Sequence, residues 1–541
     1  MNDKINQIDQ KIRVGDYDTA FTLISKEIQS SEPETKQWID LQLKLSHIIN
    51  LIGKHDESLI IAENCIEISK KKGLLEQEFE SNIIAYGACF RLGDMKNSLF
   101  FIKQAEQIIF SAPPQEIALK KKNQLIFHLK GNIFLKMGDN QSALEYYFKS
   151  LELRREQGDK NKSASTLNNI GIIYRSIGDL NKALEVLKES LELKREMGDK
   201  WSLANTLNNI GSIYKQKGEL DQAIDYYTEA KSIYTDLRVK QDISTVVHNL
   251  GEISLIKGEV SRANELLEEA LKMRKEIKNK FDITETLFFL IKTLCEKRSL
   301  QSAKTYLNEI ESYLGSNESV ILLRYKLAKG IILTLEKFDE QEEFLTFRAL
   351  NTITERFLDS TAIFVEIINA KVIDLELTVE AMFKLYELKF FELQTFHNPK
   401  IFSEVKSLAY RLKNIGEEQK SYSLMSKTYF LLGQLSLIDS EVDKGKEFLN
   451  NAYKLAEEKG YQLLAITIKQ EINKIDSKLP EWLFDDKTTI FERINELKLD
   501  LFIHSLSRNR LEQNVEVKEK NPSFSELQDF VSLLKKKDIS W

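Results

Sequence analysis

The chain has few of the residues that punctuate sheets and tight turns. Its 541 residues include only 6 prolines and 21 glycines. Folds built from strands need these residue types at their frequent chain reversals. Their scarcity argues against a protein built mainly from strands and predicts an all-α fold.

The chain also has few cysteines, no long apolar run and little excess of either charge. The 3 cysteines, Cys65, Cys89 and Cys295, are far apart and lack metal-ligand spacing, so we expect reduced thiols in the cytoplasm. No run of about 18 apolar residues occurs, and the first residues do not resemble a signal peptide, which predicts a soluble protein without a membrane partner. The net charge is −6 with both signs interleaved, so we expect no nucleic-acid partner.

Catalytic motifs are also missing. The 6 histidines do not pair at the i, i+4 spacing of metal ligands. The chain has no phosphate-binding loop, dinucleotide fingerprint or nucleophile elbow. We therefore expect no enzymatic activity, no cofactor and no metal site.

The chain has instead a repeat of 40 residues, clearest between residues 125 and 280. Two sets of glycines and one set of alanines recur at that spacing. They are Gly131, Gly171, Gly211 and Gly251; Gly138, Gly178, Gly218 and Gly258; and Ala143, Ala183, Ala223 and Ala263. Three sets with one spacing indicate a repeated structural unit.

Each unit is predicted to be a helical hairpin. It holds two segments whose apolar residues are three and four apart, as in amphipathic helices. The glycine between the segments suits the left-handed end of the first helix, and the acidic residue behind it suits the start of the second. The glycine inside the first helix is explained by close approach of the second helix, where the alanine lies.

The repeated residues resemble the tetratricopeptide repeat. The pattern is Gly171, Tyr174, Gly178, Ala183, Leu187 and Ser190, and it recurs as Gly211, Tyr214, Gly218, Ala223, Tyr227 and Ala230. That family has a usual period of about 34 residues, and the longer period here resembles the subclass of kinesin light chains and of G-protein-regulator and spindle-orientation scaffolds. The resemblance implies an α-solenoid, a superhelix of antiparallel hairpins with a concave groove that binds other proteins.

The pattern weakens on both sides of this array, which suggests five regions. They are divergent hairpins in 1–112, the core array in 115–315, divergent helical hairpins in 316–398, further tetratricopeptide-like hairpins in 400–480, and capping helices with a tail in 481–541. Pro114 and Pro399 interrupt helices at two of the boundaries. The tail is expected to contain capping helices within 482–509 and a last helix within 522–537.

Asparagines at the repeat spacing are the candidate binding residues. Asn169, Asn209 and Asn249 lie two residues before the repeat glycines. The resemblance implies that this position faces the groove, where an asparagine holds the backbone of an extended peptide. A carboxamide both donates and accepts, which matches a peptide unit. The alternative is that these side chains bond to neighbouring backbone or face water.

Six further residues fall on the same helical face and are expected to set the side-chain preference of the partner. They are Ser165, Asn205, Thr245, Ile172, Ser212 and Glu252. Chaperone-binding members of the family clamp a carboxylate with cations on this face, but the matching residues here are His128 and three asparagines, so a chaperone tail is not expected. Arg175 and Lys215 are interpreted as rim charges, and His248 as a neutral residue of the groove wall.

The favoured hypothesis is a non-enzymatic scaffold or adaptor that holds an extended or helical segment of a partner protein. One alternative is a ligand-gated regulator, in which a bound peptide changes the superhelix and releases an effector. Another is a structural subunit with its groove buried in a complex. The oligomeric state and the identity of the partner stay open.

Overall fold

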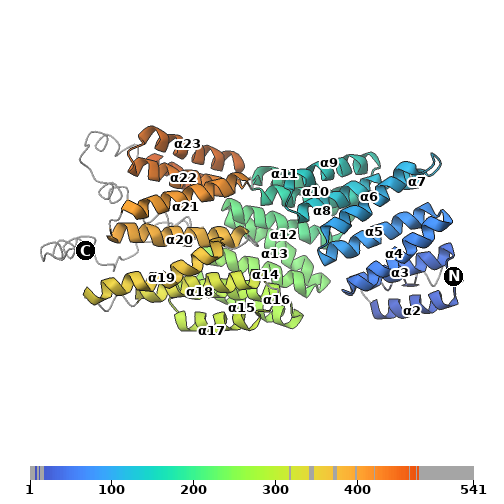
Figure 1. The fold of residues 1–541 in the computed structure, drawn as a ribbon, viewed down its shortest axis with the longest axis horizontal. Coiled ribbons are helices and arrows are strands. Elements are labelled where there is room, and N and C mark those ends of the chain that lie inside the picture. Colours follow the sequence, from blue (N-terminus) through green and yellow to red (C-terminus); the bar gives the residue numbers. More distant parts are fainter. Residues whose placement is uncertain are drawn as a thin grey trace.

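The computed structural model describes residues 7–8, 11, 17–315, 319–339, 347–369, 375–396, 399–418, 421–461, 464–470 and 472–473. The helices expected within 482–509 and 522–537 lie outside these residues. In the described part, the regular structure is helical, and consecutive helices pack as antiparallel neighbours (Figure 1). None of these helices is both long enough and apolar enough to cross a membrane.

The N-terminal helices form a first group of hairpins. Their bounds are α2 Tyr17–Ser30, α3 Lys36–Leu51, α4 His55–Lys72, α5 Leu75–Leu92, α6 Met95–Ser111 and the single turn α7 Ile117–Lys120. Helix α3 packs on α4, and α5 packs on α6. Gly53 and Gly93, both with a left-handed φ, lie at the turns of these two hairpins.

The core array follows with five hairpins. Their bounds are α8 Asn123–Lys136, α9 Asn140–Glu156, α10 Lys160–Ser176, α11 Leu180–Met197, α12 Lys200–Lys217, α13 Leu220–Leu237, α14 Lys240–Ile256, α15 Val260–Ile277, α16 Lys280–Glu296 and α17 Leu300–Ser312. The first helix of each pair also contacts the first helix of the next pair from α10 to α16. These first helices therefore form one layer of the solenoid and the second helices form the other.

The C-terminal helices continue the stack. Their bounds are α18 Ser319–Asp339, α19 Phe347–Asn369, α20 Leu375–Phe396, α21 Pro399–Glu418, α22 Tyr422–Ile438 and α23 Val442–Lys459. Pro399 is the first residue of α21, a position where its missing N–H costs nothing. Helices α18 and α20 contact each other across α19, as the first helices of the core array do.

The turns inside the core hairpins have the predicted geometry. Gly178 has a φ of +82°, in the left-handed region that ends a helix, and the other turn glycines have the same conformation. Asp179 behind it accepts a hydrogen bond from the backbone N–H of Lys182 at 3.4 Å and so caps α11. In the fifth hairpin, Arg298 has a φ of +56°, so an arginine adopts the left-handed turn there.

Glycine inside the first helix allows the two helices of a hairpin to touch, although not at the predicted residue. A Cβ at Gly171 would lie 2.5 Å from Cγ of Leu187, and a Cβ at Gly211 would lie 2.9 Å from the Tyr227 ring. We expected the second helix to approach closely where the alanine lies, but the side chain of another residue of that helix fills this place. The bulky residue four positions after the alanine fills it, because its long side chain spans the gap between the helices.

The stack curves until its C-terminal hairpin meets its middle. In Figure 1, α22 lies beside the end of α11 that is nearest to α10, although the two are far apart in sequence. The backbone N–H of Tyr422 donates to the carbonyl of Ile177 at 3.3 Å. Asn181 Nδ2 donates to the carbonyl of Glu458 at 3.1 Å. We call this junction, residues 177–181 against 421–423 and 458–461, the inter-turn contact.

Candidate functional site

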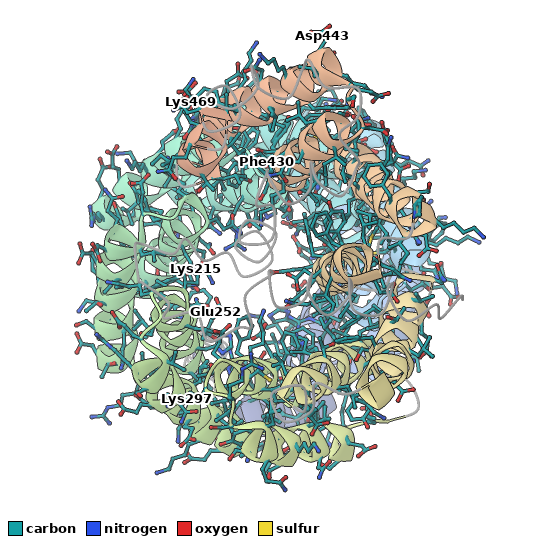
Figure 2. All side chains as sticks on the ribbon, turned by 90° about the vertical axis from the view of Figure 1, so that its left-hand side faces the viewer. Lys215, Glu252, Lys297, Phe430, Asp443 and Lys469 are labelled. Carbon is teal, nitrogen blue, oxygen red and sulfur yellow. The ribbon has the colours of Figure 1, made fainter. Side chains whose placement is uncertain are left out.

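The first helices of the core array line the inside of the superhelix. Figure 2 looks along the long axis and shows the described helices arranged around a central space, with Lys215 of α12 and Glu252 of α14 on its inner side. We call the surface of α10, α12, α14 and α16 that faces this space the inner wall. The second helices lie outside it.

The repeated asparagines of the inner wall bond to each other across repeats. Asn209 Nδ2 donates to Oδ1 of Asn168 at 3.1 Å, and Asn249 Nδ2 donates to Oδ1 of Asn208 at the same distance. Asn169 Nδ2 lies 3.4 Å from the hydroxyl of Tyr147, its donor bond to the preceding repeat. The bonds of Asn209 and Asn249 tie one first helix to the one before it, whereas Asn169 reaches Tyr147 on the second helix α9.

These bonds leave part of each carboxamide available. Asn169, Asn209 and Asn249 are half-buried, and within the described residues each uses one N–H of its amide. The Oδ1 acceptor and a second N–H of each amide keep no protein partner there. A peptide unit offers one donor and one acceptor, so it matches these two groups.

The residues four positions earlier differ in what they offer. Ser165 is exposed and its hydroxyl donates to the carbonyl of Asn161 at 3.1 Å. Thr245 is half-buried and donates to the carbonyl of Gln241 at 3.2 Å. Asn205 accepts from the Tyr234 hydroxyl at 2.9 Å. All three lie on first helices, and Ser165 presents most surface.

The residues that follow the repeat glycines also differ. Ile172 is half-buried and supplies an apolar surface. Ser212 is only 9% exposed, and its hydroxyl lies 2.9 Å from that of Tyr227. Ser212 therefore contributes little to the surface of the inner wall.

Glu252 and Lys215 form an ion pair on the inner wall, so Lys215 is not the rim charge that its sequence position suggested. Their side chains are 13% and 20% exposed. Burial would raise the pKa of Glu252, but the Lys215 ammonium, with help from His248, holds that pKa far below its usual range. Lys215 lies on the wall because the first helix of the next repeat brings Glu252 against it.

His248 is a buried residue of α14 beside the pair of Lys215 and Glu252. It is 3% exposed, and its Nε2 lies 3.4 Å from Oε1 of Glu252 and 3.9 Å from Oε2 of Glu285. Its ring meets the Phe289 ring edge-on at 5.1 Å between centroids. Two carboxylates and an aromatic ring thus fix its position.

Helices far along the sequence complete the charged lining. Lys292 of α16 lies 2.9 Å from Glu380 of α20, 88 residues later. Burial lowers the pKa of Lys427 on α22 to about 8, while Glu376 and Glu380 oppose the shift. Sequence analysis missed these residues, because only the curvature of the superhelix brings α20 and α22 to the same space.

A second set of residues missed by sequence analysis holds successive repeats together. Each is a buried cation at the end of a second helix that donates to a carbonyl eight residues later and to a threonine hydroxyl twelve residues later. They are Arg154 with Lys162 and Thr166, Lys194 with Ser202 and Thr206, and Arg274 with Asp282 and Thr286. At the end of α13, Tyr234 replaces the cation, and Val246 of α14 replaces the threonine. These pairs could have been found from the sequence, because they recur at the spacing of the repeat.

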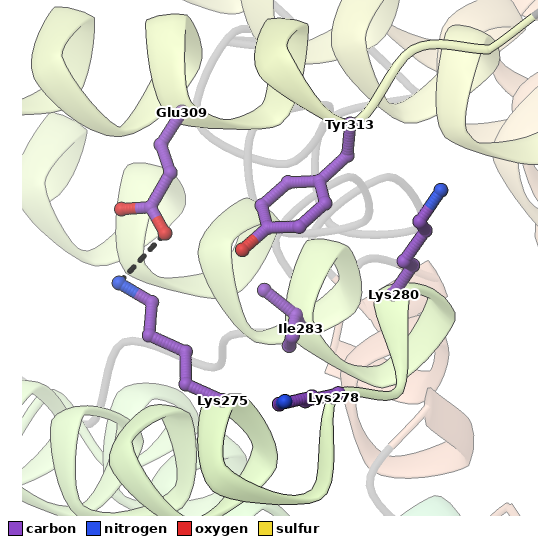
Figure 3. A pocket seen from close by; sticks show the side chains of 6 residues that line it. All are labelled: Lys275, Lys278, Lys280, Ile283, Glu309 and Tyr313. Atoms are coloured by element: carbon purple, nitrogen blue, oxygen red, sulfur yellow. Dashed lines mark ion pairs between the residues drawn. The ribbon is translucent and has the colours of Figure 1, made fainter.

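A shallow pocket lies outside the inner wall, where α15 meets α16 and α17. Its volume is about 420 Å3, and Figure 3 shows that Lys275 pairs across it with Glu309, at 2.6 Å. Tyr313 and Ile283 line the rest of it, together with two further lysines. It contains none of the candidate groove residues.

Stacked hairpins that curve around a central space make this chain an α-solenoid. Residues 124–196 and 202–276 match the family model described as tetratricopeptide repeat. The chain therefore contains tetratricopeptide repeats, which confirms the resemblance on which the expected fold was based. No curated protein matched the chain significantly.

Several solved structures are similar to parts of this chain at low identity. BtubC (BKLC) from P. vanneervenii is 19% identical, with 42% of this chain and 92% of that chain covered and a TM-score of 0.37. A Rap protein complexed with Competence and Sporulation Factor is 12% identical, with coverages of 83% and 99% and a TM-score of 0.44. The apo quorum sensor NprR from B. thuringiensis is 14% identical, with coverages of 75% and 98% and a TM-score of 0.39.

Proposed function

We propose that this chain is a non-enzymatic, cytoplasmic adaptor whose inner wall binds a segment of a partner protein in an extended or helical conformation. The observation that carries the proposal is the row of Asn169, Asn209 and Asn249. Each carboxamide bonds to the preceding repeat through one N–H, and its acceptor and second N–H have no partner in the part of the chain that the structure describes. Consecutive first helices thus offer a regular series of polar groups that suits a main chain rather than one particular side chain.

The neighbouring residues supply the selectivity in this proposal. Ile172 offers an apolar contact, and the pair of Lys215 and Glu252 offers both charges. Specificity in a partly desolvated groove depends on such contacts, because an unmatched charge or polar group costs binding energy.

The test is photo-crosslinking in cell lysate followed by mass spectrometry. A photoreactive amino acid at position 172, on the inner wall, is compared with one at position 185, where Glu185 is exposed on the second helix α11. The proposal expects a partner that crosslinks from 172 and not from 185. Crosslinks from 185 alone would place the binding surface on the outside and contradict the proposal.

A triple variant tests the asparagines themselves. Asn169→Ala/Asn209→Ala/Asn249→Ala should lose the crosslinked partner. The matched control is Glu185→Ala/Asp225→Ala/Glu265→Ala, which alters exposed residues of the second helices at the same spacing. Circular dichroism and gel filtration establish that both variants are folded. Retention of the partner by a folded asparagine variant would exclude the ladder from recognition.

The inter-turn contact favours a second candidate, a regulator that responds to a bound peptide. The contact joins 177–181 to 421–423 and 458–461. It therefore closes the helices between them into a ring around the central space and limits the width of that ring. A ligand that fits the ring better when the contact is open would shift the chain to the open form. Small-angle X-ray scattering with and without the captured partner segment tests this: an adaptor keeps its scattering curve and a regulator changes it.

A further inference from the structure

One guanidinium of the inner wall lacks an ion-pair partner among the described residues. Arg175 lies at the end of α10 and is partly buried. Within the described residues, its guanidinium makes neither a hydrogen bond nor an ion pair. Burial lowers the pKa of Arg175, which Tyr227 and Glu376 oppose from a distance. A charge that has lost water without gaining a partner favours an anion brought by a ligand.

The next repeat shows what is missing at Arg175. Lys215 stands 40 residues later in the same register and pairs with Glu252, 37 residues further on. The residue 37 positions after Arg175 is Ser212. Its hydroxyl is engaged by Tyr227, at 2.9 Å, and by the carbonyl of Asn208, at 3.0 Å. The position that would neutralise Arg175, by analogy with Glu252 and Lys215, therefore holds the small neutral residue Ser212.

Two other cations of the inner wall have an ion-pair partner within the described residues. Lys215 has Glu252, and Lys292 of α16 has Glu380 at 2.9 Å. Arg175 thus differs from both of them, although all three lie on first helices. It is also the one with a planar fork of donors, which binds a carboxylate through two parallel hydrogen bonds.

We propose that Arg175 binds a carboxylate of the partner segment, so that the inner wall selects an acidic peptide. This assignment rests on the proposed function. The carboxylate belongs either to an Asp or Glu side chain or to the free C-terminus of the segment. Asn169 lies on the same helix, about 9 Å from Arg175 along its axis, so the groups that hold main chain and carboxylate are close enough for one short peptide.

The experiment uses random eight-residue peptides displayed on beads, in one library with free C-termini and one with amidated C-termini. Wild-type protein should enrich peptides with Asp or Glu at one position, or should require the free C-terminus. Arg175→Glu should invert the preference to Lys or Arg and weaken binding of a selected wild-type peptide by at least about tenfold. The control Lys188→Glu reverses an exposed charge on α11 and should change neither.

A second variant tests the same idea without removing Arg175. Ser212→Glu places a carboxylate where Glu252 lies one repeat later, so it should occupy Arg175 and abolish the acidic preference. Retention of that preference by Arg175→Glu or by folded Ser212→Glu would overturn the assignment. Wild-type selection of peptides without any acidic preference would overturn it too, while leaving the proposed function intact. If the wild type selected no peptides, the proposed function would fail together with it.

Discussion

Lys459 Nζ lies 3.0 Å from Oδ2 of Asp179, although 280 residues separate the two. Asp179 is the cap of α11 and only 6% of its side chain is exposed, so this ion pair is largely shielded from water. Lys459 also lies over the Tyr422 ring, 4.4 Å from its centroid. The pair marks the place where one turn of the superhelix meets the next.

Opening the inter-turn contact should expand the molecule. The variant Lys459→Ala/Asn181→Ala removes the ion pair to Asp179 and the bond from Asn181 to Glu458. We expect a larger radius of gyration in small-angle X-ray scattering and a loss of roughly 1–3 kcal/mol in the free energy of unfolding, since the shielded Asp179 carboxylate loses Lys459 and keeps the more distant Lys182, at 3.5 Å. The control is Lys454→Ala on the same helix, where the lysine side chain is 74% exposed. An unchanged scattering curve would show that other contacts hold the junction.

Adding one methyl group at Gly211 should destabilise the chain. Alanine is the better helix former by roughly 1 kcal/mol, but its Cβ would lie 2.9 Å from the fully buried Tyr227 ring. We expect a net loss of about 1–2 kcal/mol, because overpacking a rigid core exceeds the gain. Gly87→Ala is the matched control, since its Cβ would meet only the Asn50 amide at 3.4 Å, and it should be neutral or stabilising. Urea unfolding followed by circular dichroism compares the two.

The buried cations and their threonines should behave as coupled pairs. Thr206→Val removes the acceptor that Lys194 reaches at 2.7 Å, and we expect it to cost about 1–3 kcal/mol. Adding Lys194→Tyr and Ser165→Asn rebuilds the arrangement of the repeat that has Tyr234 and Val246. The triple variant should therefore recover most of the lost stability. Additive losses in urea unfolding would show that the two arrangements are not interchangeable.

Lys194 should also make stability depend on pH. Burial lowers the pKa of Lys194 to about 8 from its ordinary 10.5. Between these values the unfolded chain holds a proton that the folded chain has released, so stability rises with pH in this window. Relative to Lys194→Met, wild type should gain on the order of 1–2 kcal/mol between about pH 7.5 and about pH 9.5. A constant difference between the two proteins would mean that Lys194 stays charged when folded.

The hairpins were predictable because their information is local. Gly178 ends one helix and Asp179 caps the next, so two adjacent residues determine the turn. The same kind of turn recurs every 40 residues. The row of asparagines was also identified from the sequence, but the hydrogen bonds between repeats were not predicted. Asn209 donates to Asn168, and Asn249 donates to Asn208. Both acceptors are the first residues of the sequence doublets Asn168-Asn169 and Asn208-Asn209.

The closure of the superhelix could not be predicted from the repeat. A small rotation at each of many hairpins accumulates until Lys459 reaches Asp179, and no single residue encodes that sum. The ion pair between Lys292 and Glu380 depends on the same accumulated curvature. Lys215 was wrongly interpreted as a rim charge for a simpler reason. Its partner Glu252 belongs to the next repeat, 37 residues later, and this spacing differs from the 40-residue repeat.

The inter-turn contact also changes how the array should unfold. In an open solenoid each hairpin depends on its two neighbours, so an end frays without disturbing the middle. Here the hairpin formed by α22 and α23 is also a neighbour of the hairpin formed by α10 and α11. Fraying of α23 exposes the middle of the array, and closing a loop of this length again costs several kcal/mol of chain entropy. The segment from Asp179 to Lys459 should therefore melt as one cooperative block rather than hairpin by hairpin.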